Sequence, residues 1–132
     1  MGNAAFSLKK ICNVLIAGKS IAAWGGENPV GKIPEILDRL VSVYNPAFIY
    51  LYGSFAWGQP EKESDLDFFV ILQDSSQKHA ERIRTGLRAL KGIQTNVDIL
   101  VFTENEIASR RNHPSTLAYK VLNKGIKLYE AA

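Results

Sequence analysis

Residues 53–70 read Gly-Ser-Phe-Ala-Trp-Gly-Gln-Pro-Glu-Lys-Glu-Ser-Asp-Leu-Asp-Phe-Phe-Val, and this stretch decides the fold. It joins two apolar runs, 48–52 and 68–72, that have the length and composition of buried strands. Asp65 and Asp67 stand at the start of the second strand. Because successive strand side chains point to opposite faces, the two carboxylates share one face about 6 to 7 Å apart, while Leu66 points into a core.

This pair of carboxylates needs a positive charge. Two acids at the start of a buried strand repel each other and lose hydration. No Lys or Arg lies between Lys62 and Lys78 to neutralise them locally. A bound divalent metal ion would supply the charge, and hard oxygen ligands suit Mg²⁺, with Mn²⁺ as the alternative.

A third acid, Asp98, lies in a third apolar run, Asn-Val-Asp-Ile-Leu-Val-Phe at 96–102. If this strand lies beside the strand at 66–72, Asp98 joins the face of Asp65 and Asp67. Gly53 permits a positive φ and a close approach of the backbone, and the Ser54 hydroxyl and the amides after it can donate to phosphate oxygens. The sequence therefore predicts a combined metal and phosphate site.

The spacing of these residues resembles the polymerase-β-like nucleotidyltransferase superfamily: Gly53-Ser54, ten residues, then Asp65-Leu66-Asp67, with Asp98 on a later strand. The short chain is similar to the minimal nucleotidyltransferases of that superfamily. The resemblance covers the chain from about residue 33 to its C-terminus.

Two other positions bear on the resemblance. Ser64 also fits it, and we expect this residue to brace the nucleotide-binding loop that contains Gly53 and Ser54. Trp57 departs from it, because such proteins often carry a basic residue there. Trp57 either stacks on a base or packs in the fold.

The resemblance implies an activity and a partner. A hydroxyl attacks the α-phosphorus of a nucleoside triphosphate, expected to be ATP, and pyrophosphate leaves. Two Mg²⁺ ions (or Mn²⁺) are bridged by Asp65 and Asp67, and Asp98 binds the ion that holds the attacking hydroxyl. The acceptor is expected to be a tyrosine of a helical HEPN-type toxin, with this chain as the antitoxin.

Two other functions are weighed against this one. A non-catalytic binding module would neutralise its partner by contact alone. Nucleotidyl transfer to a small molecule such as an aminoglycoside would need a substrate domain, or a homo-oligomer that builds the pocket. The sequence does not choose between a homo-oligomer and a complex with a second protein.

Composition limits the class of protein. The chain has 132 residues and a net charge of +3, which favours one domain that attracts a nucleotide and argues against extended nucleic-acid binding. No apolar stretch reaches the ~18 residues that cross a membrane. The single cysteine, Cys12, excludes an internal disulfide, so we expect a cytoplasmic protein.

The periodicity predicts an α+β fold: a small mixed β-sheet with helices packed mainly on one face. Residues 1–32 are expected to form an N-terminal extension without an assigned role, a helix at 4–16 followed by a Gly- and Pro-rich loop at 24–31. Residues 33–132 are expected to form the nucleotidyltransferase domain. Its expected elements are helices at 34–44, 77–90, 103–110 and 115–123, and strands at 47–52, 66–72, 97–102 and 126–129.

Two local signals sharpen this reading. Thr103, with Glu106 three residues later, predicts a capping box at a helix start. The helix at 77–90 carries several basic residues, including Arg82, Arg84 and Arg88, which form either a solvated helix face or a surface for an acidic partner.

Overall fold

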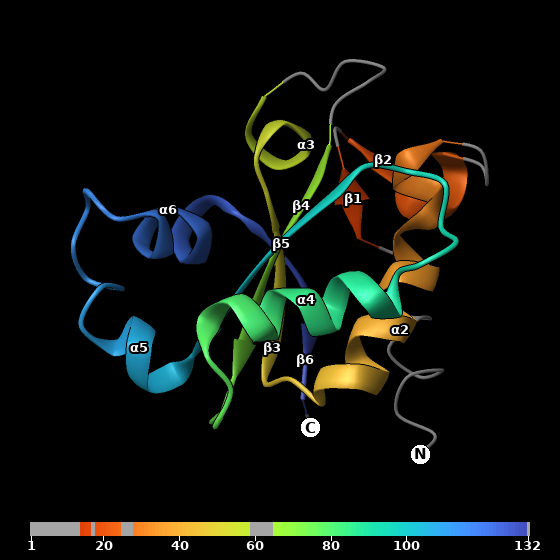
Figure 1. Cartoon of the computed structure of the whole chain (residues 1–132). Helices are drawn as coiled ribbons and strands as arrows, with labels where there is room; N and C mark the ends of the chain where they lie inside the picture. Colours follow the sequence, from red (N-terminus) through yellow and green to blue (C-terminus); the bar gives the residue numbers. More distant parts are fainter. Residues whose placement is uncertain (1–13, 17, 25–27, 59–64, 132) are drawn as a thin grey trace.

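The computed structural model describes residues 14–16, 18–24, 28–58 and 65–131. In these ranges a four-stranded mixed sheet has the strand order β5-β4-β3-β6 (Figure 1). β3 pairs antiparallel with both β4 and β6, and β4 pairs parallel with β5. The strands are β3 Phe48–Tyr52, β4 Leu66–Leu72, β5 Val97–Thr103 and β6 Ile126–Glu130. The predicted α+β fold with a mixed sheet is confirmed.

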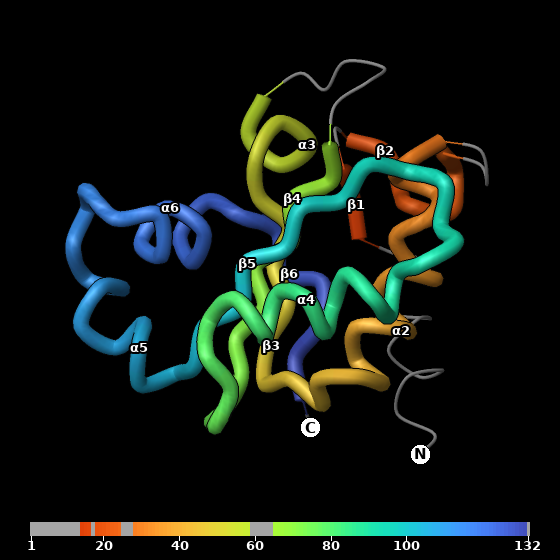
Figure 2. Tube along the Cα trace, in the orientation of Figure 1, coloured from red at the N-terminus to blue at the C-terminus, as the bar shows by residue number. Residues whose placement is uncertain are grey.

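The parallel pairing of β4 with β5 requires a crossover connection, and the helix α4 (His79–Ala89) provides it. α2 (Ile33–Tyr44) packs beside α4 on the same face of the sheet (Figure 2). The larger hydrophobic cluster lies between these helices and the sheet. It contains Leu37 and Leu40 of α2, together with Phe68 and Val70 of β4.

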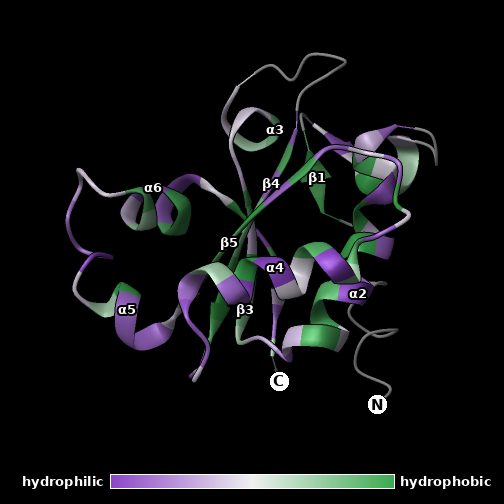
Figure 3. Cartoon of the chain, viewed as in Figure 1, coloured by the Kyte–Doolittle hydropathy of each residue, from purple (hydrophilic) through white to green (hydrophobic). Residues whose placement is uncertain are grey.

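The other face of the sheet is covered by shorter helices, α5 (Glu104–Ala108) and α6 (Leu117–Lys124). Phe69 and Ile71 of β4 point to this face, where they contact Ile107, Ala118 and Val121. β4 is therefore buried on both faces, which explains its continuous apolar sequence. Figure 3 shows the central strands as mostly hydrophobic and α5 as largely hydrophilic.

The segment before α2 differs from the prediction. Leu15–Ile16 (β1) and Lys19–Ser20 (β2) form a small antiparallel pair, so the expected helix at 4–16 is wrong at its described end; the rest of it lies outside the described residues. Two 3-10 helices follow, η1 (Ile21–Trp24) and η2 (Pro29–Lys32). Residues 25–27 of the expected loop also lie outside the described residues.

The N-terminal segment contributes to the main core. The side chains of Ile16, Ile21 and Val30 are at most 1% exposed and belong to the same cluster as α2. The predicted domain boundary at residue 33 stays a prediction. None of the helices in the described ranges is both long and apolar enough to span a membrane.

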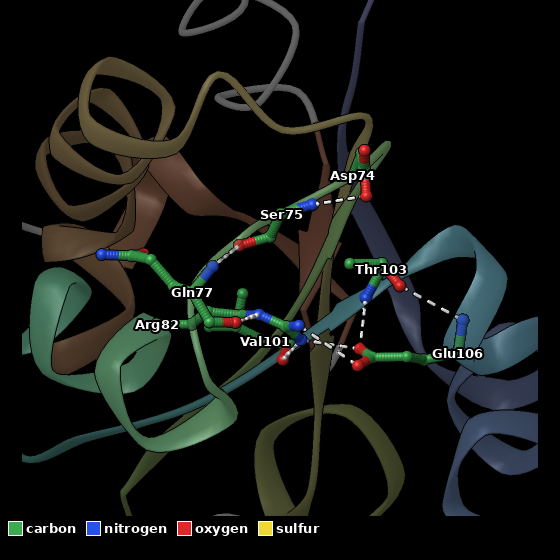
Figure 4. A network of polar contacts seen from close by, with 7 residues as sticks. All are labelled: Asp74, Ser75, Gln77, Arg82, Val101, Thr103 and Glu106. Atoms are coloured by element: carbon green, nitrogen blue, oxygen red, sulfur yellow. Dashed lines mark hydrogen bonds and ion pairs between the residues drawn. The ribbon is translucent and has the colours of Figure 1, made fainter.

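Arg82 of α4 corrects the expectation that the basic residues of this helix are all solvated. Its side chain is only 7% exposed and extends from α4 to Glu106 of α5, with Nη1–Oε1 and Nη2–Oε2 distances of 2.6 and 3.2 Å (Figure 4). It also donates to the carbonyl oxygens of Gln77 and Val101. Arg84 and Arg88 are exposed, as expected.

Glu106 connects this ion pair to the start of α5. The predicted capping box is confirmed, because the backbone N–H of Glu106 donates to Thr103 Oγ1 at 3.2 Å and the N–H of Thr103 donates to Glu106 Oε1 at 2.8 Å. The hydrogen bond from Arg82 lowers the pKa of Glu106 to about 2. This network fixes α4 and α5 to opposite sides of the C-terminal end of β5.

Glu106→Gln is expected to lower the free energy of unfolding at pH 7 by about 1 to 2 kcal/mol, because the buried Arg82 loses its counter-charge while solvent partly screens the pair. Gln keeps the capping box. The folded-state pKa lies below the unfolded value of about 4.3, so the stabilisation is present above that pH and is lost as the pH falls towards 2. Urea unfolding at several pH values measures this. Glu104→Gln, at an exposed position of the same turn, is the control. Equal losses of stability in the two variants would contradict a stabilising role of the Arg82–Glu106 ion pair.

Candidate active site

The strand register brings Asp67 and Asp98 together. Asp67 of β4 is paired with Asp98 of β5, and on its other side with Tyr52 of β3. Paired residues of neighbouring strands point to the same face, so the three side chains form a row across the sheet with about 5 Å between adjacent strands. Asp65 lies two residues before Asp67, just outside β4, and shares this face.

Exposure differs among the three acids. Asp67 is half-buried, whereas Asp65 and Asp98 are exposed, so neither flanking carboxylate is turned into the core. Burial raises the pKa of Asp67 to about 6, and the negative charges of Asp98 and Asp65 add to the shift. Among the described residues no ion pair involves any of these aspartates. The described residues therefore leave the mutual repulsion of these acids uncompensated.

Tyr52 is a site residue that the sequence analysis missed. Burial raises the pKa of its phenol to about 12, with further contributions from the charges of Asp67 and Asp98. Tyr52 therefore stays protonated beside the acids at neutral pH. Its ring packs 5.9 Å from the ring of Trp57 and 6.2 Å from that of Phe69, measured between centroids. The place of Tyr52 beside Asp67 follows from the register of β3 and β4, which the sequence does not give.

Gly53 joins β3 to α3 (Ser54–Trp57) and lies against Asp67. Its backbone has φ 79° and ψ −156°, a conformation that residues other than glycine rarely adopt. A Cβ at this position would overlap Oδ2 of Asp67 and lie 3.0 Å from its Cγ. Its carbonyl accepts hydrogen bonds from the N–H groups of Ala56 and Trp57. Glycine thus lets the backbone turn sharply against the central carboxylate, directly before Ser54 begins α3.

The chemistry of the donor set suits a hard cation, and its arrangement is open. The three aspartates offer carboxylate oxygens, which Mg²⁺ and Mn²⁺ prefer. Within the ranges that the structure describes, no group of three His, Cys, Asp or Glu side chains is arranged to hold a metal ion. The aspartates therefore share one face without forming a closed coordination sphere. Ser64, the remaining predicted site residue, lies outside the described residues.

The sequence profile of a family described as "Polymerase beta, Nucleotidyltransferase" matches residues 32–132. The chain belongs to the polymerase β nucleotidyltransferase family. The resemblance seen in the spacing of Gly53-Ser54 and the aspartates is thereby confirmed. A search of the curated proteins found no match to this nucleotidyltransferase sequence.

Solved structures share the fold of this nucleotidyltransferase at low sequence identity. A candidate nucleotidyltransferase from Sulfolobus solfataricus is 19% identical, with a TM-score of 0.53, over 96% of this chain and 86% of that one. A toxin–antitoxin complex with AMP-PNP is 21% identical, with a TM-score of 0.52, over 74% and 73%. A mutant of the toxin–antitoxin MntA–HpeT is 20% identical, with a TM-score of 0.50, over 76% and 73%.

Asp67→Asn is expected to stabilise the metal-free nucleotidyltransferase by about 1 kcal/mol at pH 7, because it removes the central charge of the acidic row. In the wild type the folded-state pKa lies above the unfolded one, so folding binds a proton between about pH 4 and 6 and stability falls as the pH rises through this window. The stability of the variant should not fall in this pH window. Thermal unfolding with a chelator present measures both effects. Asp38→Asn on α2 is the control, and a lower midpoint for Asp67→Asn would contradict the prediction.

Gly53→Ala is expected to destabilise the nucleotidyltransferase by more than Gly18→Ala. Both glycines have φ 79°, but a Cβ at Gly18 would have nothing within 4 Å, so that variant carries only a backbone cost of about 1 to 2 kcal/mol. A Cβ at Gly53 must in addition displace the Asp67 carboxylate. Chemical denaturation of both variants tests the comparison, and equal losses would show that Gly53 does not approach Asp67 closely.

Proposed function

We propose that this chain transfers AMP from ATP to a hydroxyl group, with a tyrosine of a helical HEPN-type partner protein as the acceptor, and that it acts as the antitoxin of that partner. The observation that carries the proposal is the row of acids at the start of β4 and β5, beside Gly53, for which the described residues supply no ion-pair partner. Family membership supplies the reaction class, nucleotidyl transfer. The acceptor, the nucleotide and the metal are parts of the proposal.

Unpaired acids support a role for bound cations. A half-buried carboxylate between two other acids lowers the stability of the fold, as the raised pKa of Asp67 shows. The protein pairs the buried Arg82 with Glu106 elsewhere, yet no described cation pairs with Asp65, Asp67 or Asp98. Acids kept in this state are typical of a functional site whose ligand brings the opposite charge.

The roles of the residues follow from their positions. Asp65, Asp67 and Asp98 would hold Mg²⁺ or Mn²⁺, and the bound ions would supply positive charge to the attacking oxygen and to the departing pyrophosphate. Gly53, without a side chain, admits the phosphates close to the backbone, and the Ser54 hydroxyl donates to a phosphate oxygen. Ser64 braces the same loop.

The transfer exchanges one bond to phosphorus for another. The acceptor oxygen forms a bond to the α-phosphorus of ATP while the bond from that phosphorus to pyrophosphate breaks, and pyrophosphate leaves with the electron pair. Asp98, an exposed acid at the β5 end of the row, would receive the acceptor's proton on a carboxylate oxygen.

Two of the solved structures with the same fold support an ATP-like nucleotide and a toxin as partner. One is a toxin–antitoxin complex with AMP-PNP, an analogue of ATP. The MntA–HpeT mutant carries two aspartate-to-glutamate substitutions two positions apart, the spacing that separates Asp65 from Asp67 here. These facts belong to those proteins, and they support the proposal for this chain by analogy of fold.

A second candidate function is a binding module that neutralises its partner by contact alone. The open arrangement of the acids favours it, because the described residues contain no ready group of three metal ligands. The two candidates differ in their response to nucleotide. Transfer requires ATP and a divalent ion, whereas a contact antitoxin neutralises its partner without either.

The test is mass spectrometry of the protein encoded next to this chain's gene, after incubation with this chain, ATP and Mg²⁺. We expect one added AMP on a tyrosine, and none with chelator. The Asp65→Asn/Asp67→Asn double variant should be at least ~100-fold slower, since it removes charges needed in the transition state. Asp38→Asn is the matched control. An unmodified partner that is still neutralised would favour the binding module, and full activity in the double variant would rule out the assigned site.

A further inference from the structure

Lys120 of α6 lies over the ring of Trp57, with its Nζ atom 4.1 Å from the ring centroid. Trp57 ends α3, the short turn that begins with Ser54 directly after Gly53. Lys120 itself is exposed, and no ion pair of the described residues includes it. A positive charge is thus held against the turn that leads away from the acids, and no anion of the described chain neutralises it.

A continuous line of contacts runs from Lys120 to the acidic row. The ring of Trp57 packs against that of Tyr52, with centroids 5.9 Å apart, and Tyr52 pairs with Asp67 across β3 and β4. α6 packs against β3 on this face. Lys120 therefore stands two aromatic rings away from the central carboxylate, on the same side of the sheet. A ligand that touches the acids through cations at one end and is negative at the other would extend from the acidic row to Lys120.

The ammonium group of Lys120 can also move towards such a ligand. An ammonium group over an indole ring in contact with water is held weakly, and a lysine side chain has four flexible methylene groups. The stem can stay on the ring while the ammonium group turns towards an anion.

A hydrogen-bond donor without an acceptor lies beside Lys120. The Nε1 atom of Trp57 is buried and has no hydrogen-bond partner among the described residues. A buried donor without an acceptor is costly and calls for an explanation. In the described protein neither the Trp57 N–H nor the Lys120 ammonium group has a hydrogen-bond acceptor, and of the two Lys120 is the one exposed to a ligand.

We propose that Lys120, positioned on the ring of Trp57, binds the β- and γ-phosphates of the nucleoside triphosphate. The proposal rests on the proposed function, because it needs a triphosphate between the acidic row and α6. Gly53 and Ser54 offer that ligand only backbone and hydroxyl groups, whereas Lys120, among the residues that the structure describes, places a positive charge on this side of the site. Lys120 would contact the pyrophosphate that leaves, and the pairing with Trp57 would set where the leaving group is bound.

The experiment follows binding through Trp57 itself. The chain has two tryptophans, so Trp24→Phe leaves Trp57 as the only one. In this background we titrate Mg²⁺-ATP, Mg²⁺-tripolyphosphate and AMP, reading Trp57 emission, with calorimetry as a second measure. ATP and tripolyphosphate should change the emission, because they draw Lys120 away from the ring. Activity is not needed for this readout.

Lys120→Met is expected to weaken binding of ATP and tripolyphosphate by about 10- to 100-fold, the loss typical of a hydrogen bond to a charged group. Its affinity for AMP should change little, since AMP lacks the β- and γ-phosphates. Lys124→Met, one turn further along the exposed side of α6, is the matched control and should bind as the parent does. Lys120→Arg should recover most of the affinity. Thermal unfolding establishes that each variant is folded.

The outcomes separate this inference from the proposed function. Equal ATP affinity for Lys120→Met and Lys124→Met, in a protein that still transfers AMP, overturns only the role of Lys120. A loss of AMP affinity as large as that of ATP also overturns it, because Lys120 would then act on the nucleoside. A parent chain that binds neither ATP nor tripolyphosphate overturns both.

Discussion

The parallel pairing of β4 with β5 is the constraint on which the site depends. It places Asp67 opposite Asp98, and the antiparallel partner β3 adds Tyr52 on the other side. A shift of this register by one residue would turn Asp98 to the opposite face and place Ile99 beside Asp67. Two features hold the register: the apolar side chains of β4, buried on both faces, and the Arg82–Glu106 ion pair, which ties the crossover helix to the end of β5.

The two ends of β4 and β5 differ in whether their charged side chains have partners. At the C-terminal end, Arg82 is buried but satisfied by Glu106 and by two backbone carbonyl groups. At the N-terminal end, three acids face one another without a partner in the described protein, and Gly53 adopts a backbone conformation that brings it against one of them. The first arrangement stabilises the fold, whereas the second lowers stability and suits a ligand that carries cations.

The sequence predicted the elements whose signals are local. β4 was expected at 66–72 and lies there, and the capping box of Thr103 and Glu106 opens α5. The helix expected at 4–16 is wrong where it is described, because Ile16 enters the core from a short strand rather than from a helix face. Tyr52, Lys120 and the buried Arg82 could not be found in this way. Their roles depend on contacts with residues distant in the sequence. The periodicity and spacing of residues do not predict such contacts.

The central claim is that Asp65, Asp67 and Asp98 jointly hold the cations of a bound triphosphate next to Gly53. Crystals soaked with Mn²⁺ and a non-hydrolysable ATP analogue test it most directly, since manganese is located by its anomalous scattering. The account predicts manganese in contact with carboxylate oxygens of all three residues, at the roughly 2 Å distance of metal–oxygen bonds, and phosphates against Gly53 and Ser54. Manganese bound elsewhere, or an Asp98 carboxylate that stays outside the coordination sphere with the analogue in place, would contradict it.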